Sequence, residues 1–479
     1  MKATRTMLSA LSVAVALAVA LAAGHCLAAP SYADPQVSLV MTPQKVAQAQ
    51  EIDAYNLGVM AYTWGYPLVR LERILREYID VPANKPPTSY RGPLNQIGWA
   101  TALSTPADKD MPTANNDTLY MSAVVKLDEP FVLSVPDTAD RYYVINVFDM
   151  YHDLEHYIGR RATGTQAGRF ALVPPGWEGT LPAGVKALPV STDKVWLWGR
   201  VHIRQGEDLA PVLALQKQFD LRPLSQLGKA GYVPAKQSLP PLPSIDGDEL
   251  GFFTHLGYAM QHNRMKTVDQ ALVGQLARIG LTPEHGFDRS KLTAEQLRGL
   301  KRALADGPLV AGKATMTSTV LRNGWNVALV KEFGYDYPGR SVMAGAYLGG
   351  NLAEEAVYPI RFTDEQGKPL NGENPYRLTF AKAPPVGAFW SLTIYNAGDK
   401  MLVDNPIGRY KVGSDTPGLQ VAADGSISIP IQHAQPAGAG KANWLPAPKG
   451  DFYLLLRLYQ PDASILDGSY ALPQVTRAR

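Results

Sequence analysis

The stretch Arg141–Asp149, with the sequence RYYVINVFD, decides the fold class because aromatic and β-branched residues dominate it. Such residues favour an extended, at least half-buried strand. A short turn separates it from an earlier stretch of the same kind, Pro130–Val135 (PFVLSV). The same order returns near the C-terminus, where Pro375–Phe380 (PYRLTF) precedes Phe389–Asn396 (FWSLTIYN). The sequence therefore predicts two β-rich regions with a similar order of strands.

A third pair of stretches extends this similarity. Val195–Val201 (VWLWGRV) and Phe452–Leu458 (FYLLLRL) are both apolar, and each carries one arginine. These patterns predict a mainly β protein with α segments, an α+β fold in which a helical middle region joins two β-sandwich or jelly-roll-like units. Strands of unrelated sandwiches also look alike, so a common origin of the two units stays open.

The rest of the chain is predicted to be helical or irregular. Helical spacing and capping signals predict helices over Thr42–Tyr62, Pro67–Tyr78, Glu249–Asn263, Val268–Ile279, Thr293–Gly307 and Ser341–Tyr358. A proline-rich stretch, Pro234–Pro243, is typical of a linker. We therefore expect N-terminal helices and a sandwich over residues 34–233, a linker and helical region over 234–358, and a C-terminal sandwich over 359–479.

Residues 1–33 have the three parts of a secretory signal peptide. Lys2 and Arg5 supply the positive start, Leu8–Ala23 is almost entirely apolar, and Ser31–Ala33 forms a cleavage pattern. A retained membrane anchor is the alternative, but the apolar run is shorter than the roughly 20 residues that a spanning helix needs. The sequence predicts a periplasmic or secreted protein, and the exact cleavage site stays open.

Composition and missing motifs exclude several classes of protein. The only cysteine, Cys26, lies in the signal region, so the mature chain can form no disulfide and no thiolate metal site. The formal charge of +3 falls to +1 without Lys2 and Arg5, which gives no reason to expect a nucleic-acid partner. No later stretch reads as a transmembrane segment. The chain has no P-loop, no strand-linked G-x-G-x-x-G, no G-x-S-x-G and no C-x-x-C-H, so ATP, NAD and haem are not expected.

Two polar groups are candidate catalytic or metal sites. His152, Glu155 and His156 form an H-x-x-E-H pattern, which on a long helix binds zinc. Gly159 follows within a few residues, so a divalent metal is one interpretation and a polar surface segment the other. The second group comprises acids that a hydrolase could use together with His152, namely Asp117 and Asp149. Asn115 and Asn116 beside Asp117 would line a substrate pocket or simply cap a turn.

Arginines and aromatic residues are candidate ligand-binding residues. Arg200 and Arg457 lie in apolar strands, where each needs a structural ion-pair partner or serves as an anchor for a carboxylate or phosphate. Trp390, Tyr395 and Trp444 either stack on a saccharide or another flat ligand, or pack in the core.

Several motifs resemble two protein families. Asn115–Tyr120, Asp140–Tyr143, Asp149–Met150 and Gly159–Gly164 resemble the domain of unknown function numbered 1254. A second set resembles the domain numbered 1214, and comprises Pro384–Pro385, Ala388–Ser391, Thr393–Tyr395, Asn405, Arg409–Tyr410, Asp424–Gly425, Asn443–Pro446 and Arg457–Tyr459. The two domains commonly occur together in this order, often after a signal peptide. The resemblance implies a two-part, β-rich architecture without a settled activity, so no catalytic residue can be carried over.

The functional hypothesis is an exported protein that binds a saccharide or an amphipathic organic compound of the envelope or environment. If the protein is an enzyme, we expect a hydrolase that uses acid–base residues or a bound metal. The alternative is a non-catalytic carrier, or a structural component of a homo-oligomer. Acids gathered with histidine in a pocket would favour the enzyme, whereas aromatic residues without titratable groups would favour the binder.

Overall fold

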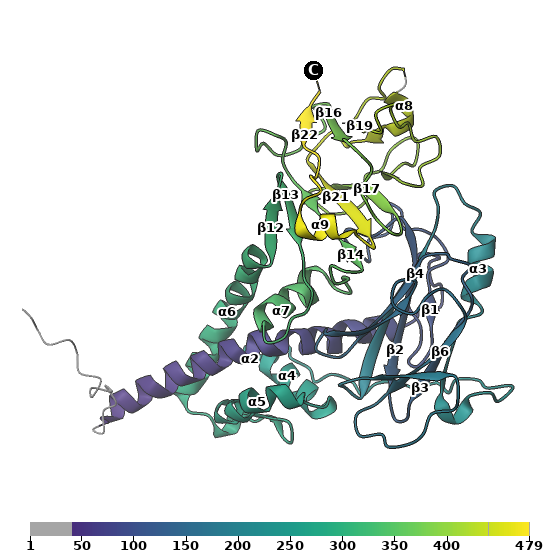
Figure 1. Ribbon diagram of the computed structural model, residues 1–479. Helices are drawn as coiled ribbons and strands as arrows, with labels where there is room; N and C mark the ends of the chain where they lie inside the picture. The colour runs from purple at the N-terminus through teal and green to yellow at the C-terminus, as the bar shows by residue number, and fades with distance from the viewer. Residues whose placement is uncertain (1–40, 439, 479) are drawn as a thin grey trace, which may run out of the picture. The chain divides into compact units, whose positions relative to one another are not determined.

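The computed structural model describes residues 41–438 and 440–478 (Figure 1). The predicted signal peptide, residues 1–33, lies outside the described residues. The chain divides into two units, Met1–Gln50 and Glu51–Arg479. Of the first unit, the structure describes the start of helix α2 (Pro43–Ile79). All sheets of the described chain belong to the second unit.

Two sheets pack face to face in the N-terminal half of the second unit. Their strand orders are β1-β2-β8-β4-β5 and β7-β6-β3-β9. Side chains such as Met121 and Ile145 of the larger sheet share one core with Leu133 and Phe170 of the smaller sheet. The strands are β1 (Gly98–Trp99), β2 (Thr118–Lys126), β3 (Phe131–Val135), β4 (Tyr143–Phe148), β5 (Leu154–Gly159), β6 (Gly168–Val173), β7 (Val185–Pro189), β8 (Lys194–His202) and β9 (Asp220–Pro223).

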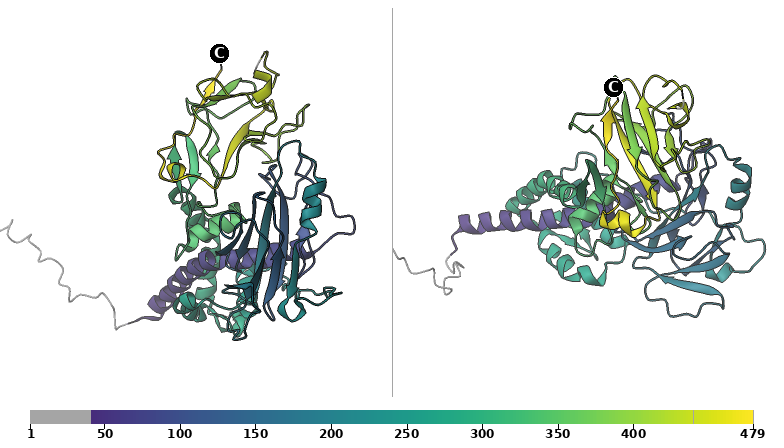
Figure 2. Two further views of the ribbon diagram at one scale, coloured as in Figure 1. Left: turned by 45° about the vertical axis from the view of Figure 1, so that its right-hand side comes forward. Right: turned by 45° about the horizontal axis from the view of Figure 1, so that its top comes forward.

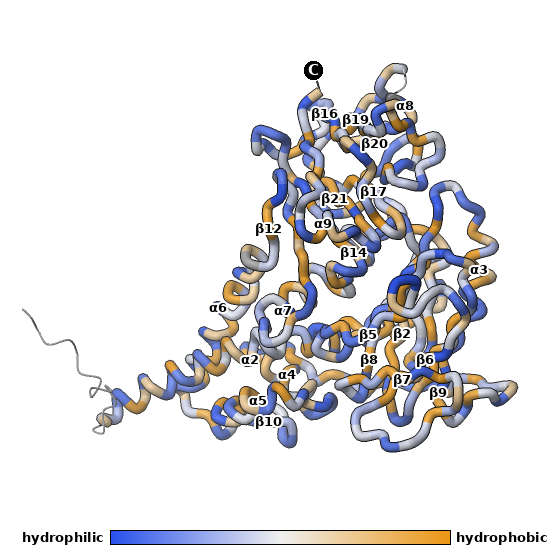
Figure 3. The backbone as a smooth tube through the Cα atoms, viewed as in Figure 1, coloured by the Kyte–Doolittle hydropathy of each residue, from blue (hydrophilic) through white to orange (hydrophobic). Residues whose placement is uncertain are grey.

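The larger of these sheets is buried on both faces. Every residue of β8 is buried, and so is every residue of β2 except Lys126. The second face carries Tyr120, Trp196 and Trp198, which share a core with helices α2 and α4 (Gly251–His262). Hydrophobic residues accordingly recur along these central strands (Figure 3), as expected for strands that are covered on both sides.

Helix α2 is continuous over 37 residues, whereas the sequence predicted two helices. Pro67 lies inside it and has no N–H to donate to the carbonyl of Thr63, one turn earlier. Ser341 Oγ donates to this carbonyl instead, at 2.5 Å. This hydroxyl thus satisfies the carbonyl that the proline leaves without a backbone donor.

Two further helix predictions were wrong in extent. Helix α6 (Ala294–Thr317) begins with the predicted capping box but continues through Pro308. Gly307 does not end it but lies inside the helix, where a Cβ would lie 2.6 Å from Cγ of Tyr62 on α2. Helix α7 (Tyr337–Ala346) ends early, shortly before Gly349 takes a left-handed φ of 68°. The other helices are α3 (Ala210–Gln216), α5 (Gln270–Leu276), α8 (Gly440–Asn443) and α9 (Ala463–Asp467), and a β10–β11 hairpin (Leu281–Thr282, Gly286–Phe287) follows α5.

The C-terminal region forms a second pair of sheets. The larger has the order β12-β13-β15-β21-β17-β18, with β14 also beside β21, and the smaller has the order β20-β19-β16-β22. Their strands are β12 (Thr319–Arg322), β13 (Trp325–Ala328), β14 (Ala356–Val357), β15 (Ile360–Arg361), β16 (Tyr376–Phe380), β17 (Trp390–Asn396), β18 (Lys411–Gly413), β19 (Ile427–Gln432), β20 (Leu445–Pro446), β21 (Phe452–Tyr459) and β22 (Val475–Arg477).

The two sandwiches share one pattern of strand pairing. Figure 2 shows both β-rich regions from two further directions. β4 pairs antiparallel with β8 as β17 pairs with β21, and β3 and β16 each lie in the smaller sheet. Val144 is opposite Arg200, and Ser391 is opposite Arg457. The predicted α+β fold with two β-rich units is confirmed. Within the described ranges, no helix is both long and apolar enough to cross a membrane.

Candidate functional site

An open cleft of about 520 Å³ lies where the turn after β4, the chain before α5 and the first turn of α7 meet. Its walls combine apolar and charged side chains. They comprise Asp153, Leu154, Lys266, Val268, Asp269, Lys331, Glu332, Phe333, Gly334, Tyr335, Arg340 and Leu352.

Asp149 shapes the turn that brings Asp153 to the cleft. Its Oδ1 accepts hydrogen bonds from the backbone N–H groups of Tyr151, at 2.8 Å, and Asp153, at 2.9 Å. Between them, His152 has a φ of 62°, which is uncommon for a residue other than glycine. Asp149 Oδ2 lies 2.6 Å from Lys266 Nζ, and Lys266 also forms an ion pair with Asp153. The turn and the lysine are therefore held as one unit.

Arg340 is the most unusual residue of the cleft. Only 2% of its surface is exposed. Its Nη1 donates to Asp153 Oδ2 at 2.8 Å, and its guanidinium lies over the rings of Tyr337 and Tyr151, at 5.2 and 5.7 Å. Its Nε and Nη2 have no hydrogen-bond partner in the described chain. One edge of a buried, charged guanidinium is thus left without an acceptor.

Burial sets the protonation of the two predicted catalytic residues beside the cleft. It raises the pKa of Asp149 to about 7 despite Lys266, with Asp153 and Glu155 acting in the same direction as burial. It lowers the pKa of His152 to about 3, so this imidazole is neutral near pH 7. His152 Nε2 accepts the Gly349 N–H at 3.0 Å. Asp149 holds the turn that carries Asp153, and His152 bonds Gly349, but neither residue lines the cleft.

The three residues predicted to bind a metal do not converge. His152 lies in the turn, whereas Glu155 and His156 are neighbours on strand β5 and so project to opposite faces. Glu155 accepts the Ser191 N–H at 3.0 Å, and His156 Nε2 is 2.6 Å from the Pro189 carbonyl oxygen. The helical geometry of a zinc protease is absent here. Among residues 41–438 and 440–478, no three His, Cys, Asp or Glu residues form a group that could hold a metal.

Asp117, the third predicted catalytic residue, belongs to a different network. It forms a buried ion pair with Lys411 and accepts a hydrogen bond from Ser391 Oγ at 2.6 Å. Burial opposes its ionisation, but the charges of Lys411 and Arg457 outweigh burial, so the pKa of Asp117 is lowered. Asp117 and Asp149 contact different lysines and do not form the acid pair considered for hydrolysis.

The asparagines beside Asp117 make turn and interdomain contacts. Asn115 Oδ1 accepts the Asp117 N–H at 2.6 Å, and Asn115 Nδ2 donates to Tyr459 OH at 2.8 Å. Asn116 Nδ2 donates to the Ser104 carbonyl at 2.6 Å. These contacts are those of the turn interpretation, and neither asparagine lines the cleft.

The two strand arginines are both buried but have different surroundings. Arg457 donates to Tyr395 OH at 2.7 Å and lies within the electrostatic influence of Asp117. Arg200 donates to the Gly349 carbonyl at 2.8 Å and to Asn351 Oδ1 at 3.4 Å, both of which are neutral. Both arginines therefore donate hydrogen bonds to neutral acceptors, but the charge of Asp117 acts on Arg457 and no acid of the described chain acts in this way on Arg200.

The predicted aromatic platforms lie in the core. Trp390 is 3% exposed and packs 5.0 Å from the ring of Phe380. Trp444 is 4% exposed, and its Nε1 donates to the Gln432 carbonyl at 2.8 Å. Tyr395 is fully buried and donates to the Ala114 carbonyl. None of the three rings is open to a ligand, which corrects the stacking interpretation, because the apolar sandwich encloses them.

Comparisons with known proteins bear on the two sandwiches. Residues 94–223 match the family described as "Protein of unknown function (DUF1254)", and residues 355–463 match "Protein of unknown function (DUF1214)". The chain carries both domains. The DUF1254 domain supplies Asp153 and the DUF1214 domain supplies Lys411, whereas Lys266 and Arg340 belong to the segment between them.

One solved structure has a similar fold over most of the chain. The crystal structure of the VPA0106 protein from Vibrio parahaemolyticus is 27% identical, covers 89% of this chain and all of its own, and has a TM-score of 0.68. An uncharacterized protein from Burkholderia cenocepacia is 13% identical over 91% of this chain and 96% of its own, with a TM-score of 0.43. None of the curated proteins matches. The fold of this chain thus recurs in the protein from Vibrio parahaemolyticus.

Proposed function

We propose that this chain is an exported protein that binds a small amphipathic organic acid in the cleft beside Arg340. The observation that carries this proposal is the unpartnered Nε–Nη2 edge of Arg340. Two parallel N–H donors match the two oxygens of a carboxylate. A buried donor without a partner costs about 1–3 kcal/mol, and more when charged, so a ligand that accepts from it gains affinity.

The apolar part of the wall supports an amphipathic ligand. Leu154, Phe333 and Leu352 line the cleft between the charged residues. Val268 and Tyr335, also in the lining, are 61% and 71% exposed, so apolar surface reaches the rim. Apolar walls with a few placed polar groups are typical of small-molecule sites.

The geometry favours binding over hydrolysis. The carboxylate of Asp149 and the imidazole of His152 already hold the turn, Lys266 and Gly349. Neither lines the cleft, so neither is placed to act as a base on a ligand there. This arrangement supports the carrier interpretation. Export rests on the signal pattern, and N-terminal sequencing of the mature protein from the periplasm should begin at Asp34 if cleavage follows Ala33.

Isothermal titration calorimetry with hexanoate and neutral 1-hexanol tests the binding site. We expect hexanoate to bind and hexanol to bind much more weakly. Arg340→Gln should raise the hexanoate Kd about tenfold or more, the effect of losing a charged hydrogen bond. Arg340→Lys keeps the charge but not the paired N–H donors of the guanidinium. Its hexanoate Kd should therefore lie between those of the unchanged protein and Arg340→Gln.

The matched control is Arg169→Gln, which changes an exposed arginine on β6 outside the cleft lining. Its hexanoate Kd should equal that of the unchanged protein, and melting temperatures should show that all variants fold. Equal binding of hexanol and hexanoate, or unchanged binding by both folded Arg340 variants, would contradict the proposal.

A further inference from the structure

Arg200 is a buried cation with no acid at hydrogen-bonding distance in the described chain. Its two hydrogen-bond acceptors, the Gly349 carbonyl and Asn351 Oδ1, are neutral and belong to one short segment. Burial opposes its charge, while nearby tyrosines such as Tyr358 and Tyr459 raise its pKa. A buried charge without a counter-charge is costly. The position therefore suits an acidic group that the chain itself does not provide.

The segment Gly349–Asn351, here called the plug, covers Arg200 through polar contacts. The Gly349 N–H donates to His152 Nε2 at 3.0 Å. Asn351 Oδ1 accepts from Asn146 Nδ2, and Asn351 Nδ2 donates to Tyr358 OH, both at 2.7 Å. A ligand that offers acceptors to Arg200 can replace such contacts, because it exchanges one set of hydrogen bonds for another.

Only glycine fits where the plug is closest to the sheet. Gly349 has a φ of 68°, and a Cβ there would lie 2.6 Å from Cδ1 and 2.7 Å from Nε1 of Trp198. Despite this approach, Trp198 Nε1, Asn146 Oδ1 and His152 Nδ1 have no hydrogen-bond partner in the described chain. Native proteins leave few buried polar atoms unpaired. Three of them beside one arginine are an independent sign of a polar site beneath the plug.

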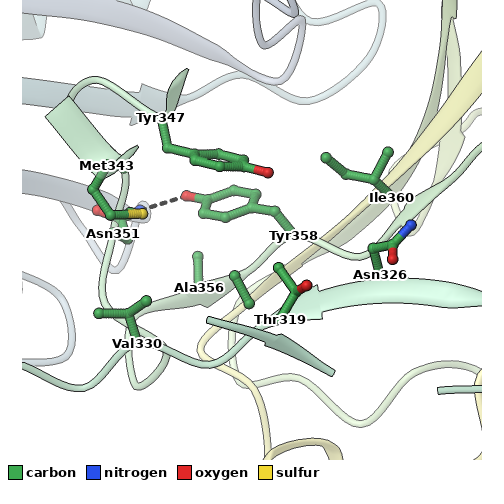
Figure 4. Close-up of a pocket in the computed structure, with 11 residues that line it drawn as sticks. Thr319, Asn326, Val330, Met343, Tyr347, Asn351, Ala356, Tyr358 and Ile360 are labelled. Carbon is green, nitrogen blue, oxygen red and sulfur yellow. Dashed lines mark hydrogen bonds between the residues drawn. The ribbon is translucent and has the colours of Figure 1, made fainter. Parts of the chain in front are cut away.

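A small cavity of about 40 Å³ adjoins the plug (Figure 4). Tyr347, Gly350, Asn351 and Tyr358 line it together with apolar side chains that include Met343. Figure 4 shows Tyr347 and Tyr358 among the lining residues, with the hydroxyl of Tyr358 bonded to Asn351. The space suits a few water molecules and becomes larger if the plug moves.

The plug is also directly joined to the cleft. Leu352, the residue after the plug, lines the cleft, and so does Asp153, the residue after His152. The chain neighbours of the plug and of His152 thus line the cleft, while Gly350 and Asn351 of the plug line the small cavity.

We infer that Arg200 is a second acid-binding subsite and that the cleft's ligand carries two acidic groups, a linear dicarboxylate being the simplest. One carboxylate binds Arg340, and the other displaces the plug and binds Arg200. This inference rests on the proposed function, because Arg340 holds the first acid. Charged acceptors replace neutral ones at Arg200, and charge-assisted hydrogen bonds are about twice as strong.

Calorimetry with dicarboxylates from succinate to sebacate, against monocarboxylates of equal length, tests the second subsite. We expect the best dicarboxylate to bind about tenfold or more tighter than its monocarboxylate. Arg200→Gln should remove this advantage, and the Arg169→Gln control should keep it. The inference fails if no dicarboxylate has an advantage, or if a folded Arg200→Gln variant retains it. Absence of any Arg340-dependent monocarboxylate binding would instead overturn the proposed function.

Two measurements keep the inference testable even if Arg200→Gln does not fold. Hydrogen exchange of the peptide covering residues 347–352 should become faster with the best dicarboxylate and not with its monocarboxylate. Asn351→Ala, which removes three hydrogen bonds of the plug, should tighten dicarboxylate binding about three- to tenfold. Exchange that is unchanged or slower, or weaker binding by folded Asn351→Ala, would contradict displacement of the plug.

Discussion

The two sandwiches each carry an arginine at the corresponding point of the same strand pair, but the two arginines have different surroundings. Arg457 lies near Asp117, which is itself fixed by Lys411 and Ser391. Arg200 meets only the neutral acceptors of the plug. A shared strand pattern therefore carries an arginine near a buried acid in one unit and an arginine with neutral acceptors alone in the other.

The difference teaches where this fold can bind a ligand. An ion pair buried with good hydrogen bonds is hard to exchange, because separating its members leaves uncompensated charges. Neutral acceptors around an arginine can be replaced by a better, charged acceptor. We therefore assign a structural role to the surroundings of Arg457 and a binding role to those of Arg200.

The largest effect should come from removing the acid of the fixed network. Asp117→Asn leaves Lys411 and Arg457 without their carboxylate and should lower the free energy of unfolding by about 3–5 kcal/mol at pH 7. The pKa of Asp117 is lowered in the folded state. Its contribution is therefore present above the unfolded pKa of about 3.9 and is lost as the pH falls through the folded value.

Urea unfolding of Asp117→Asn and the unchanged protein, at neutral and acidic pH, measures this effect. The difference in unfolding free energy should shrink in acid. A difference that is small at pH 7, or independent of pH, would mean that the two arginines have similar surroundings after all.

Replacing each arginine by methionine should give unequal losses of stability. Both variants lose neutral hydrogen bonds, but Arg457→Met also removes a positive charge that favours ionised Asp117. Arg457→Met should therefore cost about 2–4 kcal/mol and Arg200→Met about 1 kcal/mol. Urea unfolding of the two variants side by side makes each the control for the other. Equal costs would remove the distinction.

Asn351→Asp should convert the second environment into the first. A carboxylate at this position gives Arg200 a charged acceptor and should stabilise the protein by about 1 kcal/mol at pH 7. It should also abolish the advantage of dicarboxylates, since the plug then carries its own acid. Urea unfolding and calorimetry measure both effects. Asn56→Asp, an exposed change on α2, is the control. It should change neither the free energy of unfolding nor the binding free energy of the dicarboxylate by more than a few tenths of a kcal/mol.

The smallest expected effect is a pH dependence of ligand binding that comes from Asp149 and not from Asp117. Burial raises the pKa of Asp149 to about 7, whereas the pKa of Asp117 is lowered. Asp149 should therefore gain its negative charge behind Lys266 as the pH rises through about 7, which weakens binding of an anion in the cleft by about threefold. Because its raised pKa means that the folded state holds the proton, its contribution to stability also declines from about pH 4 to 7.

Calorimetry with hexanoate between pH 6 and 8 measures this decline. Asp149→Asn keeps an oxygen acceptor for the turn and should remove the pH dependence. A decline that persists in this variant would assign the titration to another group.

Sequence reasoning recovered the strands and missed the cleft for separate reasons. The strands Phe131–Val135, Tyr376–Phe380 and Phe452–Tyr459 lie within one residue of the stretches Pro130–Val135, Pro375–Phe380 and Phe452–Leu458, because local composition is enough to define a buried strand. Lys266 and Arg340 escaped notice, since they meet Asp153 across 113 and 187 residues of chain. No local signal marks a side chain whose role depends on such distant partners.

Besides contacts between distant residues, the burial of individual side chains could not be predicted from the sequence. Tryptophan is a residue type that often binds ligands at surfaces, yet Trp390 and Trp444 are both buried in the core. The H-x-x-E-H motif also depends on context, because β5 turns Glu155 and His156 to opposite faces. Asp149 and His152 were predicted as catalytic candidates, but their bonds to backbone groups of the turn and of Gly349 could not be foreseen.

The serine that completes helix α2 has a consequence for the order of folding. The Thr63 carbonyl beside Pro67 finds its donor in Ser341, 278 residues later. During synthesis this carbonyl has no such partner until most of the chain has been made. Contacts of such long sequence separation slow folding and leave unfinished chains exposed to aggregation. A fragment that ends before Ser341 would thus contain every residue of α2 but would lack this hydrogen-bond donor for the Thr63 carbonyl.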